Sequence, residues 1–382
     1  MRIQNGVSIV LFMAMSMIPL VFADMLPERV SVRENRMLAA SPVLADLKKG
    51  PETFIRKFDA WFKDSTGFRE QLLTLYHAVE ESRLLNTIWN VEGGHVFLVG
   101  EQGYRYFADQ GGILIPKFQG KQFLSDEQLQ NTAAKLEEVR KYLDGRGIPL
   151  AVMICPDKES VYPEFYPKLI KRGPEPDQLD VITGYLREHT GADVFSIRRA
   201  LVAEKDAYPP WDKAGGLGAL THYNQIGAFF GYRELMRHIN IHFPGMVPYE
   251  LEDLEISYDE LGENPVVSFK EEKRYKKLDS SFFEDFSVVD DWWGHNWNEA
   301  YENTDPGLPV ILLFRTSFSG EEYTGKFIAQ HFGKAILTQF VNMGHIEEYV
   351  TKYKPDIVVF ETAERALDMF ADSFAGIPDL NN

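Results

Sequence analysis

Hydrophobic and polar positions alternate in two different rhythms along the chain. From residue 120 onward, short apolar runs are separated by segments whose apolar residues recur every three or four positions. The runs predict strands at 148–156, 192–195, 309–314, 335–339 and 356–360, and the other segments predict helices at 125–145, 178–189, 224–239, 320–332, 344–353 and 361–371. Such alternation is typical of an α/β fold, in which helices cover both faces of a parallel sheet.

The residues before this region follow another pattern. Residues 52–64 place apolar side chains on one helical face, and a second helix is expected over roughly 68–89. Residues 93–109 alternate and carry turn glycines, which indicates a β-hairpin. We interpret residues 24–115 as an N-terminal helical and hairpin extension packed on a main domain that covers residues 116–382.

The first residues have the pattern of an export signal. Arg2 supplies a positive charge, residues 7–22 are apolar and uncharged, and Ala23 provides the small residue of a cleavage site. We expect residues 1–23 to be a signal peptide. The alternative is an uncleaved inner-membrane anchor formed by residues 7–22. Either one predicts a periplasmic or otherwise extracytoplasmic domain.

An acidic and aromatic insertion at residues 245–308 interrupts the alternation. A long insertion near the ends of strands is often a binding loop or a lid. The alternative is that it only packs over an edge of the sheet. Trp292, Trp293 and Trp297 would stack on sugar rings in the first case and join the core in the second.

Composition excludes several classes of function. The chain has 382 residues and a net charge of −17, and it contains no basic stripe, so nucleic acid is not an expected partner. The single cysteine, Cys155, cannot form an internal disulfide. The chain contains no paired-cysteine or HExxH motif for zinc and no glycine-rich phosphate loop for a nucleotide. We therefore expect neither a metal nor a cofactor.

Polar residues follow two of the predicted strands, and a histidine precedes one of the helices. Because ligands of parallel sheets bind beyond the carboxyl ends of the strands, these residues are expected near one edge. They are Asp157 and Lys158 after the first strand, Arg315, Thr316 and Ser317 after the third, and His222 before the helix at 224–239.

A serine with a histidine base is the minimal constellation for acyl transfer. Ser317 also stands where a helix begins, so backbone amides there could stabilise an oxyanion. The competing interpretation is structural: Ser317 caps the helix and His222 packs in the fold.

Seven segments, in order, resemble those of a known family over roughly residues 34–372. They are "ENRMLA", "FKDSTGFREQLL", "FLVGEQGYRYF", "CPDKESVYPE", "LTHYNQIGA", "FRTSFS" and "KPDIVVFETAERAL". Together they resemble the SGNH-hydrolase-like periplasmic proteins that O-acetylate alginate and cellulose.

The resemblance implies a Ser-His-Asp triad in permuted order, with the Asp-x-His segment before the serine. His222 and Ser317 stand at the matching positions, but Leu220 stands where the aspartate is expected. Thr316 replaces the aspartate that usually precedes the serine, and Tyr223 replaces a tryptophan. Asp212, in a glycine-rich loop, is our candidate for a substitute carboxylate.

The resemblance also implies a function, namely O-acetylation of an extracellular polysaccharide such as alginate. Ser317 would accept the acetyl group and His222 would act first as base and then as acid. A polysaccharide would be the acceptor and a membrane-bound acyltransferase the acetyl donor. Leu220 favours an alternative, a catalytically impaired binding or scaffold protein, and an acetyl esterase is a third possibility.

Overall fold

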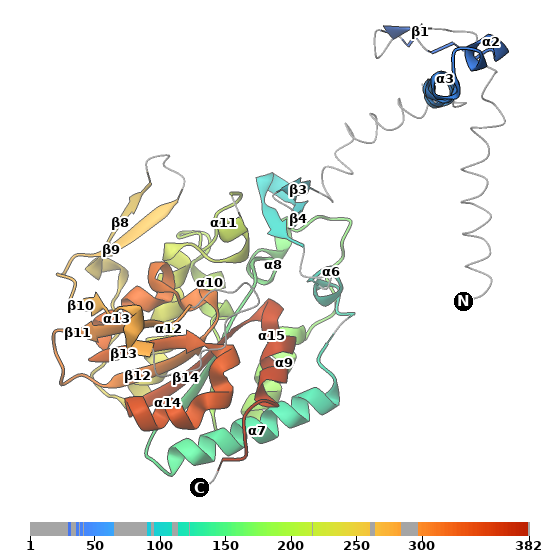
Figure 1. Cartoon of the computed structure of the whole chain (residues 1–382). Coiled ribbons are helices and arrows are strands. Elements are labelled where there is room, and N and C mark those ends of the chain that lie inside the picture. The colour runs from blue at the N-terminus through green and yellow to red at the C-terminus, as the bar shows by residue number, and fades with distance from the viewer. Residues whose placement is uncertain are drawn as a thin grey trace. The chain divides into compact units, whose positions relative to one another are not determined.

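The computed structural model describes two compact units, divided between Thr87 and Ile88 (Figure 1). The described residues are 30–31, 36–37, 39–40, 42–64, 90–92, 95–108, 114–121, 123–215, 217–259, 264–283 and 297–380. The expected signal segment 1–23 and the expected helix at 68–89 therefore lie outside them.

The N-terminal unit contains the helix predicted over residues 52–64. Helix α3, Pro51–Asp64, follows the short helix α2, Leu44–Leu47, and a two-stranded antiparallel sheet of β1, Val30–Ser31, and β2, Arg36–Met37. Phe54, Phe58 and Phe62 recur at intervals of four residues, and their rings stack at 6.5 and 6.0 Å between centroids. Across both units, none of the helices formed by described residues has the length and apolar character needed to cross a membrane.

The second unit is built on a seven-stranded sheet. Its strand order is β10-β11-β13-β12-β14-β6-β7. The five parallel strands are β6 (Leu150–Cys155), β7 (Asp193–Ser196), β12 (Val310–Arg315), β13 (Lys334–Gln339) and β14 (Ile357–Ala363). The predicted α/β fold is confirmed, and each of the five predicted strands is present.

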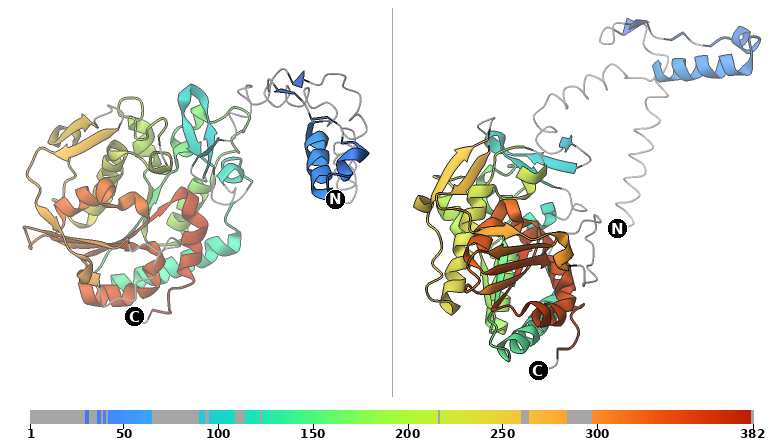
Figure 2. Two further views of the ribbon diagram at one scale, coloured as in Figure 1. Left: turned by 45° about the horizontal axis from the view of Figure 1, so that its top comes forward. Right: turned by 60° about the vertical axis from the view of Figure 1, so that its left-hand side comes forward.

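Helices cover both faces of this sheet, which explains the near-continuous apolar strands. One face packs on α10 (Arg198–Glu204), α12 (Gln225–His242) and α13 (Lys326–His331). The other packs on α7 (Asp126–Asp144), α9 (Gln178–His189), α14 (Ile346–Tyr353) and α15 (Leu367–Phe374). Alternate residues of each strand therefore enter separate cores. Figure 2 shows the helices on the two sides of the sheet.

Two edge strands come from the acidic insertion. β11, Glu299–Asn303, pairs antiparallel with β13, and β10, Tyr275–Lys277, pairs antiparallel with β11. The prediction of a purely parallel sheet was incomplete at this point, because the insertion extends the sheet. A further hairpin, β8 (Leu254–Tyr258) and β9 (Pro265–Phe269), forms a separate two-stranded sheet.

The predicted hairpin at 93–109 is part of a three-stranded antiparallel sheet. Its strands are β3 (Asn90–Glu92), β4 (His95–Val99) and β5 (Arg105–Phe107). Residues 88–115 belong to the same compact unit as the seven-stranded sheet. The boundaries that we placed at residues 23 and 115 stay predictions.

Two predicted helices begin later than expected. After β12 the chain forms a 3₁₀ turn, Ser317–Ser319, and a π-helical turn, Glu321–Gly325, before α13. After β14, which continues as a strand to Ala363, a 3₁₀ turn precedes α15. Both turns lie at carboxyl ends of neighbouring parallel strands.

Candidate functional site

Ser317 opens the 3₁₀ turn that follows β12. Thr316, not Ser317, caps this turn, because the Thr316 hydroxyl accepts a hydrogen bond from the Phe318 N–H at 3.4 Å. The structural interpretation of Ser317 as a helix cap is therefore wrong. Its hydroxyl faces another side chain instead.

That side chain is His222. The histidine follows the short helix α11, Leu217–Thr221, and its Nε2 lies 2.5 Å from the Ser317 hydroxyl oxygen. The imidazole stacks on Tyr323, with 5.4 Å between ring centroids, and also contacts the ring of Phe318. Ninety-five residues of chain separate the serine from the histidine, so the fold alone brings them together.

The other ring nitrogen of His222 meets a hydroxyl group. Its Nδ1 lies 2.8 Å from the Thr221 hydroxyl oxygen. Leu220 is buried, with 2% of its surface exposed, and offers no acceptor. The carboxylate of Asp212, our candidate substitute, accepts a hydrogen bond from the Asn224 side chain at 3.0 Å.

The electrostatic environment keeps His222 neutral. Burial, followed by the positive charge of Arg365, lowers the pKa of His222 to about 3, although a backbone hydrogen bond with Gly218 opposes both effects. At neutral pH the imidazole is therefore uncharged, and an uncharged imidazole has one nitrogen that accepts a proton. The same burial makes the protonated form costly, since the described hydrogen bonds of His222 include no carboxylate such as a complete triad has.

Two buried side chains fix the turn that carries Ser317. The Thr316 hydroxyl donates to the Glu361 carboxylate at 2.5 Å, and the Thr316 N–H donates to the same group at 3.2 Å. Tyr223 donates from its hydroxyl to the Phe318 carbonyl at 2.9 Å. A tyrosine at this position thus holds the serine turn through a hydrogen bond.

Arg315 links the end of β12 to the insertion. Its guanidinium is buried and donates to the Trp297 carbonyl at 2.6 Å, to Glu299 at 3.0 Å and to the Thr316 carbonyl at 3.1 Å. The Trp297 side chain is 40% exposed. Trp292 and Trp293 lie outside the described residues, so their placement stays a prediction.

Asp157 and Lys158 follow β6, and neither is among the described contacts of Ser317 or His222. Asp157 forms an ion pair of 2.5 Å with Arg365, and the Arg365 guanidinium lies 4.9 Å from the centroid of the Phe318 ring. Lys158 donates to backbone carbonyls of the loop that precedes α11. Both residues therefore reach the serine and the histidine through other groups.

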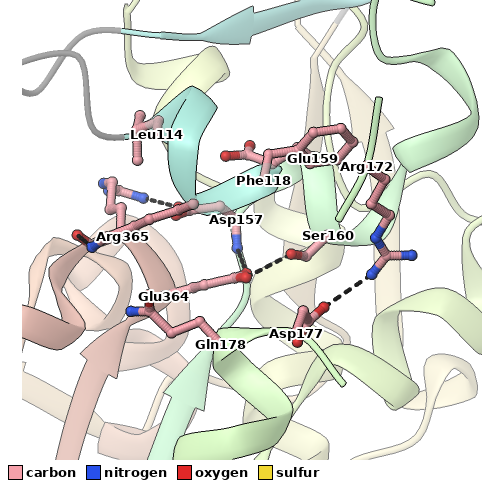
Figure 3. Close-up of a pocket in the computed structure, with 11 residues that line it drawn as sticks. Leu114, Phe118, Asp157, Glu159, Ser160, Arg172, Asp177, Gln178, Glu364 and Arg365 are labelled. Atoms are coloured by element: carbon pink, nitrogen blue, oxygen red, sulfur yellow. Dashed lines mark hydrogen bonds and ion pairs between the residues drawn. The ribbon is translucent and has the colours of Figure 1, made fainter. Parts of the chain in front are cut away.

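A cavity of about 30 Å³ has Arg365 in its lining (Figure 3). Asp157, Ser160 and Glu364 line it, and the Ser160 hydroxyl donates to Glu364 at 2.7 Å. Burial, followed by the nearby carboxyl of Asp157, raises the pKa of Glu364 to about 8. The space suits one or two water molecules, and neither Ser317 nor His222 lines it.

Among the described residues, one group of carboxylates has spacing that suits a metal ion. It consists of Glu175, Asp177 and Asp180. Arg172 and Arg198 form ion pairs with these carboxylates, so they already have cationic partners.

Sequence reasoning missed three groups of this site. Thr221 lies inside a quoted motif but carries no signal of its own, because a threonine next to a histidine is common. Glu361 and Arg365 both lie in the quoted segment "KPDIVVFETAERAL". Charged residues within and just after a buried strand were the signal that would have identified them.

The sequence comparison finds a family over part of the chain. Residues 118–252 match the family described as SGNH hydrolase-like domain, acetyltransferase AlgX. The matched segment contains Lys158, Thr221 and His222, whereas Ser317 lies beyond it. None of the curated proteins is significantly similar to the chain.

Two solved structures share this fold at low sequence identity, and a third has a lower structural similarity. A DHHW family protein from Eubacterium siraeum is 12% identical with a TM-score of 0.52, covering 77% of this chain and 98% of its own. Bacillus cereus PatB1 with a sulfonyl adduct is 14% identical with a TM-score of 0.51, covering 74% and 100%. The O-acetyltransferase domain of Pseudomonas putida AlgJ is 15% identical with a TM-score of 0.43, covering 72% and 92%.

Replacing Thr221 by valine is expected to slow the reaction of Ser317 with an acylating reagent. Valine keeps the shape and removes the hydroxyl that contacts Nδ1. One hydrogen bond to an orienting group predicts a loss of about 3- to 10-fold. Thr183→Val is the matched control, because the Thr183 hydroxyl bonds only to the helix carbonyl of Leu179 among the described contacts. Equal rates for both variants would contradict an orienting role.

Proposed function

We propose that this protein O-acetylates a polysaccharide outside the cytoplasm through a covalent acetyl-serine. The observation that carries the proposal is the 2.5 Å approach of His222 Nε2 to the Ser317 hydroxyl oxygen. That distance permits direct proton transfer. The match of residues 118–252 to an acetyltransferase family supports the choice of an acetyl group.

In the first half of the reaction, His222 Nε2 takes the hydroxyl proton while the Ser317 oxygen attacks the acetyl carbonyl carbon. The bond from that carbon to the donor oxygen breaks, and the imidazolium returns its proton to the leaving oxygen. In the second half, a sugar hydroxyl attacks the acetyl-serine with His222 again acting as base. The sugar ester forms and Ser317 regains its proton.

Arg365 supplies the positive charge nearest to this chemistry among the described interactions of His222. It lowers the pKa of His222 and lies against Phe318, one residue after the nucleophile. A fixed cation there favours the negative charge that develops on the carbonyl oxygen. Asp157, paired with Arg365, holds the guanidinium in place.

The proposal also specifies what accepts the acetyl group and what donates it. Trp297 is exposed beside the buried Arg315, and an aromatic face of this kind can stack on the apolar face of a sugar ring. We expect a membrane-bound acyltransferase to supply acetyl groups. The export signal at residues 1–23 would place the domain where both meet.

Intact-mass spectrometry of the purified protein tests the proposal. Incubation with an activated acetyl ester should add one acetyl group, and a glycan acceptor should remove it with formation of a sugar ester. Removal by water at the same rate would favour an esterase. Absence of any adduct, together with retained glycan binding, would favour the alternative of a binding protein that Leu220 suggested.

The pH dependence of Ser317 acylation should extend to unusually low pH. A free histidine loses its basic form below a pKa of about 6.5, whereas His222 has a pKa of about 3. Acylation should therefore persist from about pH 8 down to about pH 5. The rate of labelling by a sulfonyl fluoride, measured against pH, checks this. A midpoint near 6.5 would show that the imidazole is solvated.

The lowered pKa of His222 also predicts how the stability of the fold changes with pH. The unfolded imidazole binds a proton below about pH 6.5, while the folded one resists protonation until about 3. Its contribution to stability is thus complete above pH 6.5 and is lost as the pH falls toward 3. Urea titrations across this range, compared between the wild type and His222→Gln, isolate that contribution.

Introducing the missing carboxylate should raise activity at some cost in stability. In Leu220→Asp, a carboxylate aligned with His222 would stabilise the imidazolium. The rate of Ser317 acylation should then rise by about 10-fold or more. The acidic limb of the pH profile should also move upward, because a nearby negative charge raises the pKa of a histidine. Leu220→Asn is the control for size and polarity without charge. Equal rates for the two variants would mean that residue 220 does not face the imidazole.

A further inference from the structure

Lys158 is a buried cation whose described hydrogen bonds go to backbone carbonyls. Only 2% of its surface is exposed, and its ammonium group donates to the carbonyls of Asp212 at 2.5 Å and of Lys213 at 3.0 Å. It lies 5.5 and 5.6 Å from the ring centroids of Tyr104 and Tyr106. Burial lowers the pKa of Lys158 to about 7, although the Asp212 and Glu159 carboxyls oppose the change. Burying an ammonium group costs free energy, and the two hydrogen bonds of Lys158 offset part of that cost.

The segment that Lys158 holds is fastened at several further points. The Arg105 N–H of β5 donates to the Lys213 carbonyl at 2.8 Å. The Asn224 side chain donates to the Asp212 carboxylate at 3.0 Å and to the Pro209 carbonyl at 2.9 Å. Residues 209–213 are thereby fixed between β5, the end of β6 and the first turn of α12.

Four residues connect Lys213 to Gly218. Within them, Gly215 has φ of +136°, a conformation that a side chain would strain. Gly218 then forms the backbone hydrogen bond that favours protonated His222, and Thr221 contacts Nδ1. Lys213 therefore stands only five positions before Gly218 and eight before Thr221, the two residues that contact the imidazole.

We propose that Lys158 is a positioning residue for His222. Its two hydrogen bonds fix the loop that supplies Gly218 and Thr221, and these groups orient the imidazole where Leu220 cannot. This inference rests on the proposed acyl-transfer function. In a complete triad a carboxylate orients the imidazole directly. Here Lys158, which follows β6, would orient His222 through the loop that it holds.

Lys158→Met tests the proposal, because methionine nearly fills the volume but donates no hydrogen bond. In the full chain, labelling of Ser317 by a sulfonyl fluoride should slow by about 10- to 100-fold, as a displaced base predicts. The pH midpoint of labelling should also rise from its wild-type value toward about 6.5, because a loosened His222 becomes solvated. A general loss of stability moves neither quantity at temperatures where the variant is fully folded.

Lys205→Met is the matched control. Lys205 also donates to a backbone carbonyl, that of Val161 at 2.9 Å, and lies 5.2 Å from the centroid of the Tyr162 ring. Lys205 fastens the last residue of the one-turn helix that Lys158 begins, and its described hydrogen bonds do not reach the loop at residues 209–213. The labelling rate should therefore stay within about twofold of wild type. If Lys158→Met does not fold, Lys158→Gln, which keeps an amide donor, is compared in the same two measurements.

The outcomes separate the two proposals. No labelling of the wild type would overturn acyl transfer itself. Labelling of the wild type with an unchanged rate and pH midpoint in the folded Lys158 variant would overturn the positioning role alone. A slower rate with the upward shift in midpoint, absent in Lys205→Met, supports it.

Discussion

Ser317→Ala is expected to abolish the acetyl adduct completely. Alanine removes the only oxygen within 2.5 Å of His222 Nε2 among the described contacts, and no carbon–oxygen bond to acetyl can then form at residue 317. Loss of a nucleophile typically lowers the rate by about 10⁴-fold or more, to the background set by binding alone. Intact-mass spectrometry after exposure to an acetyl ester measures the adduct, and peptide mapping locates it.

Ser319→Ala supplies the control for this result. Ser319 lies two residues later in the same turn and is fully buried, so its loss perturbs the turn without removing the nucleophile. Ser319→Ala should retain the adduct at residue 317. If the adduct persists in Ser317→Ala and maps to another residue, the acyl-serine mechanism proposed here is wrong.

Much of the fold was predictable because the two hydrophobic periods differ so clearly. The runs around Leu150 and Ile311 are apolar on both faces, which indicates strands between two helical layers. Ser125 begins α7 with the expected capping box, in which its side chain accepts from the Gln128 N–H at 3.2 Å. These are local signals, and local signals are readable in a sequence.

The two edge strands were not predictable in the same way. Residues 299–303, "EAYEN", alternate over only five positions inside an acidic segment, and β10 has three residues. The pairing of β11 with β13 joins residues more than thirty positions apart, and β10 in turn pairs with β11. Short strands of this kind are defined by tertiary pairing and not by their own propensity.

The candidate site was predictable where a residue type carries the chemistry, as with Ser317 and His222. It was not predictable where a group acts by position, as with the Thr221 hydroxyl, the Gly218 backbone and Arg365. Asp212 illustrates the limit. Its charge made it a candidate partner for the imidazole, but its carboxylate accepts from Asn224 and its carbonyl accepts from Lys158. The sequence alone does not show whether the side-chain carboxylate or the backbone carbonyl of such a residue will accept a given hydrogen bond.

His222→Gln is expected to produce the second large loss, about 10²- to 10⁴-fold in the acylation of Ser317, which is the usual contribution of a general base. Glutamine keeps a polar side chain of similar size but does not take up a proton at these pH values. Labelling should therefore also lose its acidic limb, since no titrating base remains. Both the rate constant and its pH dependence are measured by the time course of sulfonyl labelling.

His238→Gln is the control for this variant. His238 has a carboxylate partner, because its Nδ1 lies 2.8 Å from Asp193, and its ring stacks on Phe195. The described hydrogen bonds of His222 include no carboxylate. Asp193 begins β7, at the end of the sheet opposite to the carboxyl end that carries Ser317, and no serine is among the described partners of His238. Its replacement should leave the labelling rate near that of the wild type. We therefore expect acylation of Ser317 to require His222 and not His238. Contact with the Ser317 hydroxyl, and not a carboxylate partner, decides which imidazole acts as the base. Equal losses in the two variants would show instead that a buried histidine matters here only for folding.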